Sequence, residues 1–252
     1  MTGAVHVDHR DKGVTLITID HVPMNTMSRA MIDRMCATLA AIEDHEEVRT
    51  IVLTGKGTIF CAGADLNESG KESSLDNYAA FGAMLEQVAT CRIPVVAAIN
   101  GPCVGGGLEL ALCCDIRLAA TDAKFVCAGV NVGLMASTYR LPRLIGLARA
   151  KAMLLTGSPH DAETAERWGL VTGVFEGGRL LDEALAIAAR VASRAPLSVE
   201  ATKRNAERAL SMSAAEAARL AESELSALNA SDDHREALAA FMERREPVFH
   251  RR

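Results

Sequence analysis

The chain has 252 residues, of which 49% are hydrophobic, 23% are charged and only 4% are aromatic. This length supports one or two domains with a well-buried core, and the ordinary charged fraction excludes wholesale disorder. With 27 basic and 32 acidic residues the formal net charge is -5. The chain therefore has no excess of Lys and Arg with which to bind nucleic acid or an anionic membrane.

The sequence predicts a cytoplasmic protein. Its first residues lack the apolar stretch of a secretory signal, and its longest uncharged stretch, between Arg92 and Glu109, is too short to span a bilayer. The seven Cys all fall between Cys36 and Cys127, and none has the C-x-x-C spacing of zinc or redox sites. We expect buried free thiols, no membrane contact and no metal site.

The first half of the chain alternates strand and helix patterns. Runs of apolar and β-branched residues predict strands over residues 14–20, 50–54, 95–99 and 116–120. Apolar residues spaced by three and four predict one helix capped by Ser28 and a second capped by Asp76 or Asn77. A short apolar helix is predicted over residues 108–114. This alternation favours a layered α/β core over residues 1–190.

From about residue 182 the pattern becomes helical and rich in Ala, Leu, Glu and Arg. Pro196 separates two helices, and Ser213 and Asp232 have the residue type that caps two more. Residues 191–252 contain ten basic and ten acidic residues, which is typical of solvated helix faces. We therefore predict that residues 191–252 form a separate helical region that serves packing or subunit contact.

A glycine-rich segment over residues 100–110 joins a predicted strand to an apolar helix. Glycine lets the backbone approach a ligand closely, and the free N–H groups in the first turn of a helix favour an anion. The segment predicts a seat for a phosphate or for the oxyanion of an enolate, or else a tight turn without a ligand. Gly107 and Leu108 stand where a P-loop needs Lys and Ser or Thr, and Leu110 stands where the dinucleotide motif needs Gly or Ala. Both nucleotide motifs are therefore excluded.

Two glycine-containing segments of the chain each carry one carboxylate. Glu109 is either a general acid or base beside an oxyanion, or a charge that favours the helix dipole. In a second segment, residues 60–66, Gly63 and Ala64 can present a backbone N–H, and Asp65 is either catalytic or holds the loop. An oxyanion hole needs two converging donors. We expect the two segments to follow neighbouring strands of one sheet and to supply one donor each.

Together these segments resemble the crotonase, or enoyl-CoA hydratase/isomerase, superfamily. FCAGADL, from Phe60, is similar to that family's first oxyanion segment, and NGPCVGGGLELALCCDIRLAA, from Asn100, is similar to its second. Further similar segments extend the resemblance over nearly the whole chain: NTMS at Asn25, LPRLIG at Leu141, LLTG at Leu154, AERWGLVTGV at Ala165 and FMERREPVF at Phe241.

The resemblance implies a crotonase-like spiral of ββα units with a C-terminal helical region that forms a homotrimer or a dimer of trimers. It implies an acyl-CoA thioester as ligand, with coenzyme A as part of the substrate and no tightly bound cofactor. The N–H groups of Ala64 and Gly106 would bind the thioester oxygen, and Glu109 would be the acid or base. The residues implied for the CoA and acyl site are Met24, Ala62, Asp65, Leu66 and Phe249, with Arg251 and Arg252 near the CoA phosphates.

One position departs from the family pattern. Counted from Lys124, the second catalytic glutamate of the hydratases falls at Gly129, and the following loop, residues 134–140, is shorter than in the family. A glycine can hold no water through a side chain, so classical hydratase activity is in doubt.

Three hypotheses follow from this departure. Glu109 works with a neighbouring polar group, for which Ser137, Tyr139 and Asn131 are the candidates. Alternatively, the reaction needs only one acid or base, as in isomerisation, decarboxylation or thioester cleavage. The third hypothesis is a protein that binds acyl-CoA with little or no turnover. Cys127 is a further candidate nucleophile, although a buried structural thiol is the favoured interpretation.

Overall fold

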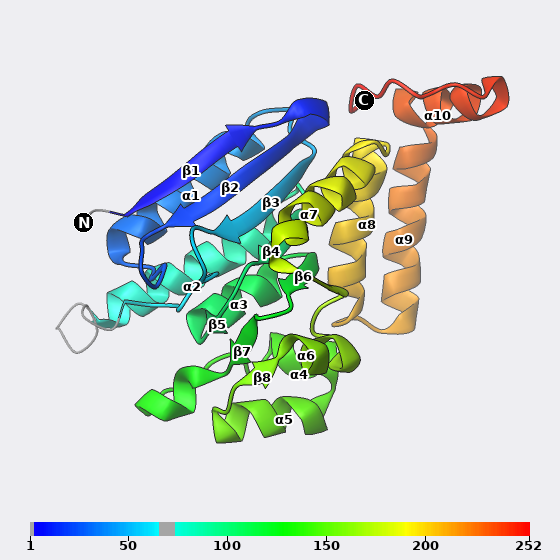
Figure 1. The fold of residues 1–252 in the computed structure, drawn as a ribbon. Coiled ribbons are helices and arrows are strands. Elements are labelled where there is room, and N and C mark those ends of the chain that lie inside the picture. The colour runs from blue at the N-terminus through cyan, green and yellow to red at the C-terminus, as the bar shows by residue number, and fades with distance from the viewer. Residues whose placement is uncertain (1–2, 66–73) are drawn as a thin grey trace.

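A six-stranded sheet, in the order β1-β2-β3-β4-β6-β9, forms the centre of the molecule (Figure 1). The computed structural model describes residues 3–65 and 74–252. β1 pairs antiparallel with β2, and every other neighbouring pair is parallel. The strands are β1 (Ala4–His9), β2 (Val14–Asp20), β3 (Thr50–Gly55), β4 (Val95–Ile99), β6 (Ile116–Ala120) and β9 (Gly173–Phe175). The four strands predicted from the sequence are confirmed as β2, β3, β4 and β6.

Helices cover both faces of this sheet. One face packs against α1 (Arg29–Glu43), α2 (Ser74–Thr90) and α3 (Gly106–Cys113), and the other packs against α7 (Gly177–Ala192) (Figure 1). Alternate strand residues serve the two cores, so that Leu53 faces the first and Val52 faces α7. Because both faces are buried, the central strands are continuous apolar runs rather than alternating ones.

Two predicted helix starts are corrected. α2 extends back to Ser74, so Asp76 lies in its first turn, where a carboxylate favours the helix dipole, and is not the cap. α3 begins at Gly106 and not at Leu108, because Gly105, with a positive φ of 55° that favours glycine, already turns the chain into the helix. The glycines therefore belong to the first turn of α3 itself.

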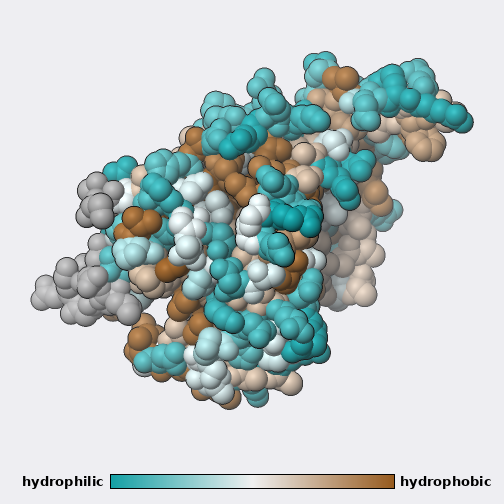
Figure 2. Space-filling view, in the orientation of Figure 1, coloured by the Kyte–Doolittle hydropathy of each residue, from teal (hydrophilic) through white to brown (hydrophobic). Residues whose placement is uncertain are grey.

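A smaller, three-stranded sheet, β5-β7-β8, lies beside the first. Its strands are β5 (Cys103–Val104), β7 (Lys124–Val126) and β8 (His160–Asp161), each too short to give a hydrophobic pattern. Short helices surround it: η2 (Ala128–Val132), α4 (Arg140–Ile145), α5 (Leu147–Thr156) and α6 (Ala162–Trp168). η1 (Asp11–Gly13) connects the first two strands of the large sheet. Hydrophilic residues cover most of the face in Figure 2, with hydrophobic residues in separate groups between them.

The C-terminal region consists of α8 (Pro196–Ala209), α9 (Ala214–Asn229) and α10 (Asp232–Glu243). Ser213 caps α9 as predicted, in a reciprocal pair with Glu216. Ser231 caps α10 by accepting the N–H of His234, so the predicted cap Asp232 lies instead in the first turn. No helix within residues 3–65 and 74–252 has the length and apolar character to cross a bilayer.

Replacing Arg117 with Met should lower the free energy of unfolding by about 3 kcal/mol. The Arg117 side chain is 7% exposed and donates to the carbonyl oxygens of Leu170 and Cys114, which would then be buried without a partner. Denaturant unfolding measures the change, with exposed Arg208→Met on α8 as the control. Equal stability of the two variants would contradict this role of Arg117.

Candidate active site

A short β-bridge directs the backbone N–H of Ala64 away from the bridge partner, Met27. Met27 donates its N–H to the carbonyl oxygen of Gly63 (2.8 Å) and accepts the N–H of Asp65 (3.3 Å). In such a parallel bridge the N–H of the intervening residue points to the other side. No described residue accepts a hydrogen bond from the Ala64 N–H.

The start of α3 supplies a second free donor. Gly105 donates its N–H to Val126 (2.8 Å) and accepts the N–H of Glu109 (3.1 Å), which begins the helix. The N–H of Gly106 belongs to the first turn, where no intrahelical acceptor is available. It has no hydrogen-bond partner among residues 3–65 and 74–252.

The two segments that carry these donors pack closely through their backbones. A Cβ added to Gly63, whose φ is 84°, would lie 2.5 Å from the Gly106 nitrogen, and one added to Gly107 would lie 2.0 Å from the Cys61 carbonyl oxygen. Only glycine permits this approach. A bridge between Cys61 and Cys103 joins the segments, and the parallel pairing of β3 with β4 confirms that they follow neighbouring strands.

The carboxylate of Glu109 lies three residues beyond Gly106 on the same helix and is held at one oxygen. Its Oε1 accepts the backbone N–H of Ser137 at 2.6 Å. Glu109 is half-buried and lines a cavity of about 180 Å³ together with Leu85, Cys113 and Ser137. A charged acceptor at this distance makes a strong hydrogen bond, which fixes the direction of the carboxylate.

The loop of residues 134–139 packs directly over Gly129. Leu134 donates its N–H to the Gly129 carbonyl oxygen (2.8 Å). A Cβ added to Gly129 would lie 3.1 Å from the Leu134 carbonyl oxygen and 3.2 Å from the Ala136 nitrogen. Backbone of the 134–139 loop thus takes up the space next to Gly129.

Of the three polar candidates near Glu109, only Ser137 contacts it in the described part of the chain. Asn131 donates its side-chain amide to the Gly157 carbonyl oxygen (3.0 Å), and the Tyr139 ring stacks on the Arg143 guanidinium at 3.7 Å. Ser137 is 5% exposed with φ 59°, a left-handed conformation that costs a non-glycine residue about 1–2 kcal/mol. The loop retains this strained conformation, which directs the N–H of Ser137 toward the carboxylate of Glu109.

Burial makes Cys127 a poor nucleophile. Desolvation, and to a lesser extent the charge of Glu109, raises the pKa of its thiol to about 12, so it is protonated at neutral pH. All seven Cys are free thiols. Within the described residues, no three His, Cys, Asp or Glu side chains gather in a way that could hold a metal ion.

The implied binding residues near Ala64 are held by a neighbour that the sequence analysis missed. The Met24 carbonyl oxygen accepts the N–H of Ala62 (3.1 Å), so these two residues are adjacent, and Asp65 continues the same segment. Asn25, fully buried with φ 50°, donates to the carbonyl oxygens of Lys56 (2.9 Å) and Ile59 (2.7 Å). The sequence feature that pointed to Asn25 was the NTMS segment, which begins at this residue. Leu66 lies outside the described residues.

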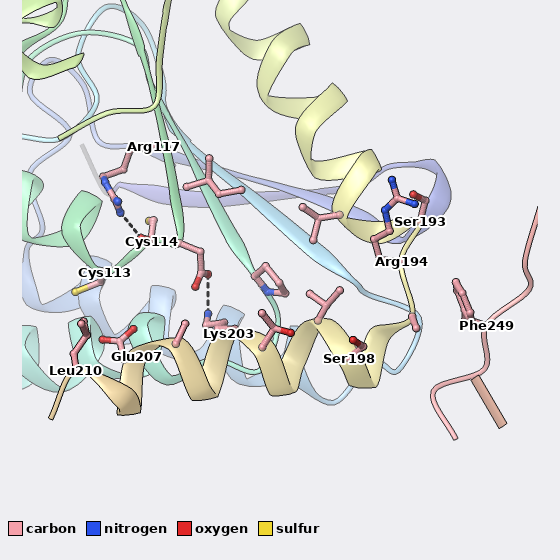
Figure 3. A pocket seen from close by; sticks show the side chains of 18 of the residues that line it. Cys113, Cys114, Arg117, Ser193, Arg194, Ser198, Lys203, Glu207, Leu210 and Phe249 are labelled. Carbon is pink, nitrogen blue, oxygen red and sulfur yellow. Dashed lines mark hydrogen bonds and ion pairs between the residues drawn. The ribbon is translucent and has the colours of Figure 1, made fainter. Parts of the chain in front are cut away.

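Phe249 lines a cavity that does not include Ala64 or Gly106 of its own chain. It lines a separate cavity of about 1120 Å³ against α8, at the opposite end from Cys113 and Leu210 (Figure 3). Its carbonyl oxygen accepts a hydrogen bond from Arg49 (2.7 Å). Arg251 makes a two-fold ion pair with Glu200 (2.8 and 3.0 Å). A contact of Phe249 with CoA stays a prediction.

Residues 9–252 match the family model described as enoyl-CoA hydratase/isomerase. The chain belongs to this family. A probable enoyl-CoA hydratase of Rhizobium meliloti is 36% identical over 244 residues, covering 95% of each chain. The (E)-benzylidenesuccinyl-CoA hydratase of Thauera aromatica is 38% identical, covering 94% of this chain and 98% of that protein. These relatives support an enzyme of the hydratase/isomerase family.

The fold agrees with this family as well. The crystal structure of an enoyl-CoA hydratase from Bacillus anthracis superposes with a TM-score of 0.95 at 31% identity, covering 98% of this chain and 99% of that one. The predicted crotonase-like α/β fold is therefore confirmed.

Replacing Gly63 with Ala should destabilise the protein by about 1–3 kcal/mol more than replacing Gly57 with Ala. Both glycines have φ near 75–84°, so both variants carry the same backbone cost, but a Cβ at Gly57 meets nothing within 4 Å. The difference isolates the overlap with Gly106. Denaturant unfolding of both variants measures it, and equal losses would show that the close approach is not needed.

Proposed function

We propose that this protein is a CoA-thioester enzyme of enoyl-CoA hydratase/isomerase type that stabilises an enolate and moves a proton with Glu109. The observation that supports this most strongly is a pair of N–H groups, from Ala64 and Gly106, that have no acceptor among the described residues and belong to two segments in close contact at the start of the helix bearing Glu109. Two converging donors beside a carboxylate are suited to a carbonyl whose neighbouring carbon loses a proton.

The chemistry follows from the thioester. Its carbonyl makes the neighbouring C–H acidic, because the deprotonated form is an enolate with its charge on oxygen. Donors fixed in advance by the backbone stabilise that charge without reorganisation, and losing one typically raises the barrier by about 3–4 kcal/mol. Glu109 itself is half-buried, so its carboxylate is partly shielded from water, and a lower local dielectric strengthens such interactions.

In this proposal coenzyme A is part of the substrate and no cofactor is tightly bound. The acyl-CoA would lie along Met24, Ala62, Asp65 and Leu66, since the first three adjoin the Ala64 donor. The relative from Thauera aromatica, (E)-benzylidenesuccinyl-CoA hydratase, is likewise named for a CoA thioester. Phe249 would contribute from a neighbouring subunit.

We also propose a homotrimer or a dimer of trimers, assembled through the C-terminal helices. Helix α9 has no fully buried residue, and large apolar side chains on α9 and α10 are exposed: Leu225 is 65% exposed, and Phe241 and Met242 are each 80% exposed. Apolar groups displayed in this number favour burial against another chain.

Glu109→Gln should lower kcat about 100- to 10,000-fold and leave thioester binding intact, because the amide keeps the shape but cannot carry the proton. Turnover of crotonyl-CoA and of 3-enoyl-CoA thioesters, with calorimetric binding of a saturated acyl-CoA, measures both quantities. Unchanged turnover would remove Glu109 from the mechanism.

The competing function is an acyl-CoA-binding protein without turnover, which Gly129 favours because it provides no second side chain. The wild-type protein distinguishes the two: binding without any product across a panel of CoA thioesters would establish the binder and refute the enzyme.

Light scattering should give a mass of three or six times the 26.8 kDa chain. Phe241→Glu combined with Met242→Glu should shift the protein to smaller species, because burying two charges at a contact is costly. Leu155→Glu on α5, where Leu155 is 73% exposed, is the control. A monomeric wild-type protein would rule out the proposed assembly.

A further inference from the structure

We propose that Arg140 selects the acyl part of the substrate, and that the preferred thioesters carry a carboxylate at the far end of a short acyl chain. This inference rests on the proposed function and specifies its substrate class. It is carried by an unpartnered nitrogen of Arg140, by the place of this side chain in the cavity of Glu109 and by the charges around that cavity.

The first step is the unused donor of the Arg140 guanidinium. Its Nη2 donates to Oε2 of Glu86 at 3.0 Å, but its Nε is buried and has no hydrogen-bond partner among the described residues. Buried donors are almost always paired, because the hydration that they lose must be replaced. An arginine cannot avoid this cost by losing its proton, since its guanidinium stays charged. The unpaired Nε is therefore a reason to expect a bound acceptor.

The second step is the position of this side chain relative to Glu109. Both line the cavity of about 180 Å³, together with Leu112 and Cys113, which follow one turn further along α3. Burial raises the pKa of the Cys113 thiol to about 12, and the charge of Arg140 is the strongest influence in the opposite direction. The guanidinium thus lies near Cys113, about one helical turn from the proposed proton carrier.

A shared wall closes the cavity at this end. Four of its lining residues also line the larger cavity shown in Figure 3: Leu112, Cys113, Tyr139 and Arg140. They therefore form the partition between the two cavities. The Arg140 guanidinium carbon lies 6.0 Å from the centre of the Tyr139 ring, a contact that helps to orient it. An acyl chain that passes Glu109 ends against this partition.

The third step is the charge that such a chain would meet. Among the described residues that line the cavity of Glu109, Arg140 is the one cation. Its partner Glu86 has a side chain that is 63% exposed, so water screens this ion pair and weakens it. The Arg140 side chain is only 26% exposed. A carboxylate at the end of the acyl chain would supply the missing acceptor and a charge-assisted hydrogen bond, whereas a methyl group would supply neither.

The spacing indicates the length of the acyl chain. Cys113 is four residues beyond Glu109, which corresponds to about 6 Å along a helix. Four carbon–carbon bonds of about 1.5 Å, in a zigzag, cover most of this distance, and a hydrogen bond covers the rest. If the carbon next to the thioester carbonyl lies at Glu109, the carboxylate is the sixth carbon. The small volume of the cavity also favours a short chain.

The first experiment compares two saturated thioesters of equal length, so that no turnover intervenes. Hexanoyl-CoA ends in a methyl group and adipoyl-CoA ends in a carboxylate. Calorimetry on the wild-type protein should give a Kd about 10- to 100-fold lower for adipoyl-CoA. Equal affinity, or tighter binding of hexanoyl-CoA, would overturn this inference and leave the proposed function standing. If neither thioester binds, the proposed function fails as well.

The second experiment assigns the preference to Arg140. Arg140→Met keeps an apolar stem of similar shape but removes the charge and every donor. The Kd of adipoyl-CoA should rise about 10- to 100-fold, and the Kd of hexanoyl-CoA should stay nearly unchanged. Retention of the preference for adipoyl-CoA in this variant would contradict the assignment.

Arg143→Met is the matched control. Arg143 lies on the same helix and stacks on the Tyr139 ring at 3.7 Å, but it lines only the larger of the two cavities. Its replacement should leave both affinities unchanged. Equal weakening of both thioesters in Arg140→Met, together with a lower melting temperature, would show that Arg140 has a merely structural role and would overturn the inference.

Discussion

The approach of two backbone segments, at Gly63 and Gly106, is the constraint on which the proposed site depends. It follows from the parallel pairing of β3 with β4 and from the bridge between Cys61 and Cys103, which bring the two strand ends to one edge. Side chains would hold the segments apart, so the contact requires glycine. Once α3 starts at this contact, its helical geometry fixes where Glu109 lies.

Much of this arrangement could be predicted because local sequence patterns determine it. The central strands are continuous apolar runs, and the glycines stand directly after two of them. The strands β5, β7 and β8 could not be predicted, since two or three residues carry no periodicity and their pairing is set by the surrounding fold. The start of α3 was misplaced because glycine has low helix propensity, whereas the turn at Gly105 decides the boundary.

The contact between Ser137 and Glu109 could not be predicted from the sequence, for a different reason. The two residues are 28 positions apart, and the donor is a backbone N–H, which every residue type but proline possesses. The role of Arg251 in the C-terminal tail could not be predicted either. Arg251 reads as a charge for a phosphate, yet its pairing with Glu200, which also contacts Arg92, makes it part of the packing between the tail and α8. Such roles emerge only from tertiary structure.

The placement of Gly106 and Glu109 on one short helix has a stereochemical consequence. The proposed oxyanion donor and the proposed proton carrier lie three residues apart on one helix, and the Ser137 N–H holds one oxygen of the carboxylate. In the proposed mechanism the planar enolate therefore presents a single face to Glu109. A proton that Glu109 removes and returns would leave and arrive on that face, and it would be the same hydrogen whenever return outpaces exchange with solvent.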